Sequence, residues 1–71
     1  MAAIFRYGKD GRTRSYGLTT ISDTSVEVWV ESVDARRGRK LRRLAVCDDE
    51  HLDPFLSEIR KELEAGGWSE L

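Results

Sequence analysis

The sequence is poor in the residues that form disulfides and metal sites, which stabilise many small proteins. It contains one cysteine, Cys47, so no disulfide can form within the chain. His51 is its only other soft metal ligand, and two such side chains do not complete a structural zinc site. A 71-residue chain usually gains only about 3–5 kcal/mol from its core and often needs a staple. We therefore expect self-association to stabilise the fold, with no metal site and no cofactor.

Long hydrophobic runs are also missing. A membrane-spanning helix needs about 20 consecutive apolar residues, and no stretch comes near this or resembles a signal peptide. A lone cysteine fits a reducing compartment better than a secreted one. Charged residues at 35% and hydrophobic ones at 39% are typical of a folded domain with a wet surface. We expect one cytoplasmic domain, residues 1–71, that makes no membrane contact.

No catalytic or nucleotide-binding fingerprint is present. The glycines follow neither the G-x-G-x-x-G nor the G-x-x-x-x-G-K pattern. Cys47 and His51 form a formal nucleophile and base pair, but their spacing supplies no orienting group and no oxyanion hole. We expect no catalytic residues, with Cys47 as a partly buried structural thiol and His51 on the surface. The protein is expected to act by binding and not as an enzyme.

Alternating apolar and polar residues predict four strands. The first is expected over residues 3–7 and ends near Asp10-Gly11, a strong hairpin signal because both residue types tolerate positive φ. The second is expected over residues 13–21, the third over 24–33 and the fourth from about 39 to 46. A tight turn should join the second and third strands.

The third strand has the clearest pattern. One of its faces is plainly apolar, with Val26, Val28 and Val30. Trp29 should lie on the opposite face between Glu27 and Glu31. On the fourth strand, Leu44 and Val46 are expected to point toward the core.

One helix is expected after the strands. Asp53-Pro54 predicts its N-cap and first turn, although Asp49 could cap an earlier turn. Gly66-Gly67 should end it, with Trp68 folding back onto the last turn or onto a neighbouring subunit. Four apolar residues recur at helical spacing: Phe55, Leu56, Ile59 and Leu63. The predicted fold is α+β, a four-stranded antiparallel sheet followed by one C-terminal helix, with one sheet face open to solvent.

Charge is divided unevenly along the chain. Residues 1–46 hold ten Lys and Arg against five Asp and Glu, whereas residues 47–71 hold two against eight. The net charge of −1 thus conceals a basic sheet and an acidic helix, an asymmetry typical of proteins that bind nucleic acid or an acidic partner. Neutralisation of one half by the other, within the fold or across a dimer, is the plainer interpretation.

The strongest binding signal is a cluster of six cations within eight residues. Arginine bonds phosphate oxygens in pairs and stacks on bases, so a hairpin bearing such a cluster can follow a phosphate backbone. An edge strand charged to prevent aggregation is the alternative, but that needs only one or two cations. The cluster consists of Arg36, Arg37, Arg39, Lys40, Arg42 and Arg43.

Two aromatic residues are candidate stacking groups for unpaired bases. Trp29 should be exposed opposite the valines, unless it packs with Tyr7 or Tyr16 in a small cluster. Tyr16 follows the cations Arg12 and Arg14 on the second strand and has the same two interpretations.

The stretch VEVWVESVDARRGRKLRRLAV, followed by DDEHLDPFLSEIRKEL, resembles the positive cofactor 4 family of single-stranded DNA-binding transcriptional coactivators. The resemblance covers residues 26–63. It implies a role for Trp29 as the strand-three tryptophan and for Gly38, Arg39 and Lys40 as the basic turn. The family's lysine-rich second hairpin has no counterpart here, because that turn is Ile21-Ser22-Asp23-Thr24. A homodimer formed through the helix is also implied, and the interface residues would be Phe55, Ile59, Leu63 and Trp68.

The sequence thus favours binding of single-stranded DNA or RNA by a basic, partly aromatic sheet face of a homodimer, with a role in transcription or DNA maintenance. The candidate site comprises the six-cation cluster together with Arg12, Arg14, Tyr16 and Trp29. The alternative is a small protein-interaction module, an inhibitor or adaptor that docks on another protein through its basic hairpin or acidic helix.

Overall fold

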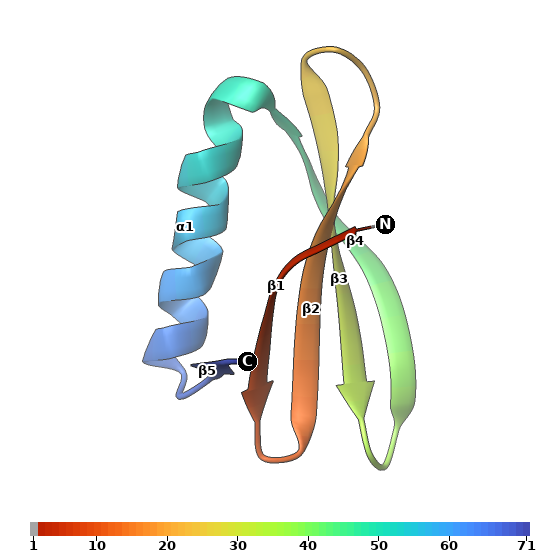
Figure 1. The fold of residues 1–71 in the computed structure, drawn as a ribbon, viewed down its shortest axis with the longest axis vertical. Coiled ribbons are helices and arrows are strands. Elements are labelled where there is room, and N and C mark those ends of the chain that lie inside the picture. The colour runs from red at the N-terminus through yellow and green to blue at the C-terminus, as the bar shows by residue number, and fades with distance from the viewer. Residues whose placement is uncertain (1) are drawn as a thin grey trace.

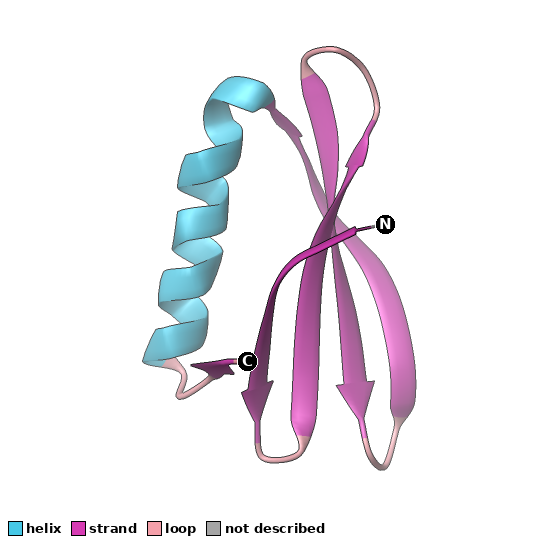
Figure 2. Ribbon diagram, viewed as in Figure 1, coloured by secondary structure: helices cyan, strands magenta, loops and turns pink. Residues whose placement is uncertain are grey.

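The structure is a computed structural model that describes residues 2–71. Its elements are β1 (Ala2–Lys9), β2 (Arg12–Thr20), β3 (Ser25–Asp34), β4 (Gly38–Asp48), α1 (Asp49–Ala65) and β5 (Ser69–Glu70). The strands form one antiparallel sheet in the spatial order β4-β3-β2-β1-β5, and α1 crosses one of its faces (Figures 1 and 2). An antiparallel sheet with one C-terminal helix was predicted and is confirmed. The sheet has five strands and not the predicted four.

The additional strand, β5, follows the helix and closes the chain against β1. It pairs with Tyr7 and Gly8, and the Leu71 N–H donates to the Arg6 carbonyl at 2.9 Å. A Cβ at Gly8 would lie 3.1 Å from the Leu71 side chain, so glycine leaves room for this contact. A strand of two residues shows no alternation, which is why the sequence pattern did not predict it.

The connections between strands follow their turn chemistry. Asp10 and Gly11 have φ values of +52° and +76°, which gives the predicted two-residue hairpin between β1 and β2. The β2–β3 connection spans residues 21–24 and is longer than the predicted tight turn. The N–H groups of Ile21 and Ser22 both donate to the Ser25 carbonyl and close it.

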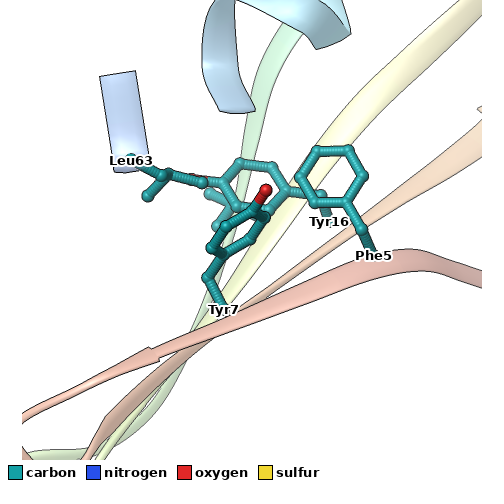
Figure 3. Packing of buried hydrophobic residues seen from close by; sticks show 5 residues of the cluster. Phe5, Tyr7, Tyr16 and Leu63 are labelled. Carbon is teal, nitrogen blue, oxygen red and sulfur yellow. The ribbon is translucent and has the colours of Figure 1, made fainter. Parts of the chain in front are cut away.

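The core lies between α1 and the strands β1, β2 and β3. Its central cluster consists of Phe5, Tyr7, Tyr16, Val30 and Leu63, and Val26 and Val28 of β3 are also buried. Figure 3 shows the Phe5 and Tyr16 rings, which stack at a centroid distance of 4.9 Å, with Tyr7 edge-on to Phe5 at 5.7 Å. Leu63 is the one buried residue of α1. Such aromatic pairs contribute about 0.5–1.5 kcal/mol beyond the area they bury.

Polar contacts anchor the C-terminal end of the helix to β1 and β5. The buried Tyr7 hydroxyl donates to Glu64 at 3.0 Å and accepts from Arg60 Nε at 3.2 Å. Arg60 also donates to Glu70 at 2.7 Å, and the Tyr7 contact and the Glu70 charge raise the pKa of the Arg60 guanidinium. Lys9 of β1 also contacts the end of the helix, where its Nζ donates to the Gly66 carbonyl.

The helix start predicted from Asp53-Pro54 was wrong by more than one turn, whereas the alternative cap at Asp49 lies next to the observed one. β4 runs directly into α1, whose N-cap is Asp48, and the Asp49 N–H donates to the Thr24 carbonyl at 3.0 Å. Pro54 therefore lies inside the helix and not at its first position. The acidic residues Asp49 and Glu50 occupy the first turn, where the helix dipole favours negative charge.

The helix ends at the glycines, as predicted. Gly67 has a φ of +87°, and the N–H groups of Gly67 and Trp68 donate to the carbonyls of Glu64 and Leu63. These two bonds form a Schellman motif, which typically brings the residue after the glycine onto the last helical turn. Trp68 accordingly packs against the core cluster of its own chain.

A bulge in β4 changes which of its side chains face the helix. Ala45 lies opposite Val28 and Arg43 lies opposite Trp29, so Leu44 is the extra residue between them. Val46 consequently pairs with Glu27, on the face away from the helix, and is 53% exposed. The predicted core position of Val46 was therefore wrong, because one inserted residue reverses every following side chain.

Candidate nucleic-acid interface

The β3–β4 turn holds the start of the six-cation cluster in a fixed shape. Asp34 Oδ1 accepts the N–H groups of Arg36 at 2.8 Å and Arg37 at 3.4 Å, and Gly38 has a φ of +82°. The Arg36 N–H is the main reason that the pKa of Asp34 lies below its ordinary value of 3.8, and the Arg37 N–H also lowers it. Arg36 and Arg37 extend from this turn and are exposed.

The strand part of the cluster divides between the two faces of the sheet. Arg42 lies opposite Val30 and Lys40 opposite Ser32, so both share the face that α1 covers. Arg39 and Arg43 lie on the opposite face, which we call the open face. There Arg43 pairs with Glu27 at 3.0 Å, and Arg39 Nε lies 3.8 Å from Glu31. The predicted single row of cations is therefore two sets, one of which is paired with carboxylates of the same chain.

Trp29 lies on the open face, away from the valines, as its position in the alternation predicted. It is half-buried and lies directly opposite Gly17 of β2. Its Nε1 is buried and has no acceptor among the residues that the structure describes. Its neighbours on the same face of β3 are Glu27 and Glu31, which form the two ion pairs of the open face. Trp29 is thus separated by the sheet from Arg14, Tyr16 and Arg42.

Tyr16 is a core residue and not an exposed platform. Its side chain is only 4% exposed and stacks on Phe5 (Figure 3). Tyr16 belongs to the buried cluster against which Leu56, Ile59 and Trp68 pack.

Beside Trp68 lies a group of cations that form no ion pair with the described residues, at the end of the sheet that carries both hairpin turns and faces the same way as the C-terminal end of α1 (Figure 1). The Arg14 guanidinium lies 4.5 Å from the centre of the Trp68 ring and that of Arg12 lies 5.3 Å from it. Both arginines belong to β2, and Lys40 and Arg37 approach from the neighbouring hairpin. Guanidinium groups stacked on an indole keep their N–H donors free for an anion.

These residues line one half of a groove on the helix side of the sheet, which we call the helix-side groove; residues of α1 border only its other half. The basic half has a volume of about 420 Å³ and is lined by Arg12, Arg14, Arg37, Lys40 and Trp68, among others. The apolar half has a volume of about 410 Å³ and is lined chiefly by Val30, Leu44, Phe55 and Ile59, with Arg42 and Glu62 beside them. Arg14, Ser32 and Trp68 line both halves, so the two adjoin.

The residues expected at a dimer interface are mostly used within the chain. Leu63 is buried in the core, and Ile59 and Trp68 pack against that core. Phe55 is half-buried and lines the apolar half of the groove.

Sequence reasoning did not predict that Trp68 joins Arg12 and Arg14. The Gly66-Gly67 stop indicated that the chain turns back, but only the pairing of β5 with β1 shows which strands it reaches. Local patterns contain no information on that long-range contact.

Among residues 2–71, no helix combines the length and the apolar character that crossing a bilayer requires. Within the same residues, no three His, Cys, Asp or Glu side chains gather closely enough to hold a metal ion. Comparisons with protein-family models, with curated proteins and with solved structures find no match to this chain.

Proposed function

We propose that the protein binds single-stranded nucleic acid in the helix-side groove. The observation that supports this is the stacking of Arg14 and Arg12 on Trp68, next to Lys40 and Arg37, at the mouth of an adjoining apolar groove. Cations along the groove suit a phosphate backbone, and their affinity for it does not depend on sequence.

Unpaired strands fit this site better than a duplex does. The aromatic and apolar side chains of the groove can contact only bases that are not stacked within a double helix. In a duplex the phosphates would reach the cations, but the apolar half would stay empty. The resemblance to the positive cofactor 4 family supports the same ligand class and a role in transcription or DNA maintenance. A homodimer, which that resemblance implies, is also proposed, and light scattering in solution tests it.

The test compares two double substitutions that remove the same charge from opposite faces of the sheet. Lys40→Ala with Arg42→Ala removes two cations from the helix-side groove, whereas Arg6→Ala with Arg43→Ala removes two cations from the open face that do not line the groove. Binding of a fluorescent single-stranded oligonucleotide is followed by anisotropy at fixed salt. We expect the groove pair to weaken binding about tenfold and the open-face pair to weaken it only about twofold.

Equal losses in the two double variants would contradict the groove as the site. No binding by the unchanged protein would remove the proposed function. Thermal unfolding of each variant checks that the fold is retained.

A second candidate function, protein interaction, is favoured by the open edge of the sheet. β4 is an edge strand, and its outward residues Leu41 and Val46 are 55% and 53% exposed on the open face. An extended protein segment could add to this edge, with specificity from alternating side chains. Capture of one stoichiometric protein partner that survives nuclease treatment, and is lost on Leu41→Glu, would favour this function.

A further inference from the structure

The apolar half of the helix-side groove contains an aromatic residue that the core does not use. Phe55 is half-buried on α1, yet the residues packed against the core cluster are Leu56, Ile59 and Trp68. Leu44, opposite it on β4, is 36% exposed. A phenyl ring and a leucine face a space of about 410 Å³ without filling it. A planar apolar group fits such a space.

Positive charge is unequal along the groove. The basic half is lined by five cations and one carboxylate, Asp34, whereas the apolar half is lined by Arg14, Arg42 and the carboxylate of Glu62. A phosphate is therefore attracted more strongly to the basic half. A ligand with an anionic group at one end and a flat apolar group at the other is favoured in one orientation.

The polar atoms around the apolar half suit the edge of a nucleobase. The carboxylate of Glu62 can accept a hydrogen bond from a ring N–H or an exocyclic amino group, and Arg14 and Arg42 can donate to a ring nitrogen or carbonyl. A lipid chain or an aliphatic peptide side chain would leave these groups unpaired, which is unfavourable in a half-enclosed site.

We propose, on the basis of the proposed function, that the apolar half is a pocket for one unpaired base of the bound strand. Phe55 stacks on the face of this base, and the phosphates beside it lie among Arg12, Arg37 and Lys40. The strand is thus bound with a base turned into the protein and not only by its backbone.

The test uses the full chain and two fluorescently labelled strands of equal length, an oligothymidine and the same strand with all bases removed. Wild-type protein should bind the base-containing strand about tenfold more tightly than the abasic one, since stacking of one base on an aromatic side chain is a substantial, sequence-tolerant contribution. Phe55→Ala should reduce this ratio to about twofold or less and leave binding of the abasic strand unchanged. The control is Ile21→Ala, which removes a 52% exposed apolar side chain that does not line the groove and should keep the ratio.

Each outcome is decisive. Equal binding of the two strands by the wild-type protein overturns the base pocket and leaves the proposed function standing. Failure to bind either strand overturns both. An equal loss for both strands in Phe55→Ala also overturns the pocket, because it indicates a change in the fold or in the phosphate site. Should Phe55→Ala fail to fold, Phe55→Leu, which keeps an apolar side chain but removes the ring, is tested instead, and an unchanged ratio in that variant overturns the pocket.

Discussion

Asp34 accepts two successive backbone N–H groups at the tip of the β3–β4 hairpin, and its side chain therefore decides how Arg36 and Arg37 are presented. Both bonds favour the charged carboxylate, which is why the pKa of Asp34 is lowered. A carboxylate with a depressed pKa stabilises the folded state above its unfolded pKa. That contribution is lost as the pH falls through the folded pKa.

We accordingly expect acid to loosen this turn below the ordinary Asp pKa of 3.8. Amide NMR signals of Arg36 and Arg37, followed from about pH 5 to about pH 2, should shift with a midpoint below 3.8 in the wild-type protein. In Asp34→Asn, which keeps the Oδ1 acceptor but cannot titrate, the same signals should stay constant over this range. A midpoint above 3.8 would contradict the turn geometry.

Individual residues also show what the sequence could reveal about the site. The alternation of β3 correctly separated Trp29 from the valines, because period-two spacing is a local property. Tyr16 and Leu63 could not be assigned to the core from spacing alone, since a buried tyrosine and an exposed one follow the same pattern. Their burial depends on where α1 packs, which is decided by residues far away in the chain.

The Schellman motif at the end of α1 positions Trp68, and Gly67 makes it possible through its positive φ. We expect Gly67→Ala to lower the free energy of unfolding by about 1–2 kcal/mol, because an L-residue is strained in this region. Gly66→Ala is the matched control. Gly66 has a φ of −84°, and an added Cβ would come no closer than 3.4 Å to any atom.

Urea unfolding of the two variants measures this difference. Gly66→Ala should change stability by much less than Gly67→Ala. A similar loss in both variants would indicate that the left-handed conformation of Gly67 is not what terminates the helix.

At the scale of elements, the sequence predicted what local patterns encode. The four long strands, the Asp10-Gly11 hairpin and the glycine stop of α1 were expected and are present. The β4 bulge was not, because the sequence around Leu44 contains no glycine or proline to mark it. The helix start was misplaced because Asp53-Pro54 is a common N-terminal signal, whereas β4 continues without a break into Asp49.

The whole molecule separates its charge by packing as well as by sequence. Six cations line the helix-side groove, namely Arg12, Arg14, Arg37, Arg39, Lys40 and Arg42. Two carboxylates line it as well, Asp34 and Glu62, whereas Glu27 and Glu31 are paired with arginines on the open face. A strand bound in the groove should therefore meet a net positive charge.

If four or five of these cations contact phosphates, the logarithm of the affinity should fall with the logarithm of salt concentration at a slope of about −3 to −4. Anisotropy titrations between about 50 and 200 mM salt measure this slope. An affinity that does not change over this range would show that the phosphate backbone is not what the groove recognises.

The helix is fastened to opposite edges of the sheet, through the peptide bond to β4 at one end and through β5 on β1 at the other. Both ends of α1 are thus attached to the sheet, and the helix cannot move away from it unless one of these strands detaches. The walls of the groove therefore have a fixed shape in the free protein, and binding should cost little conformational entropy. Cutting the chain after Gly67 would release the C-terminal end of α1 from β1, so that the helix could move relative to the sheet and the groove would lose its fixed shape.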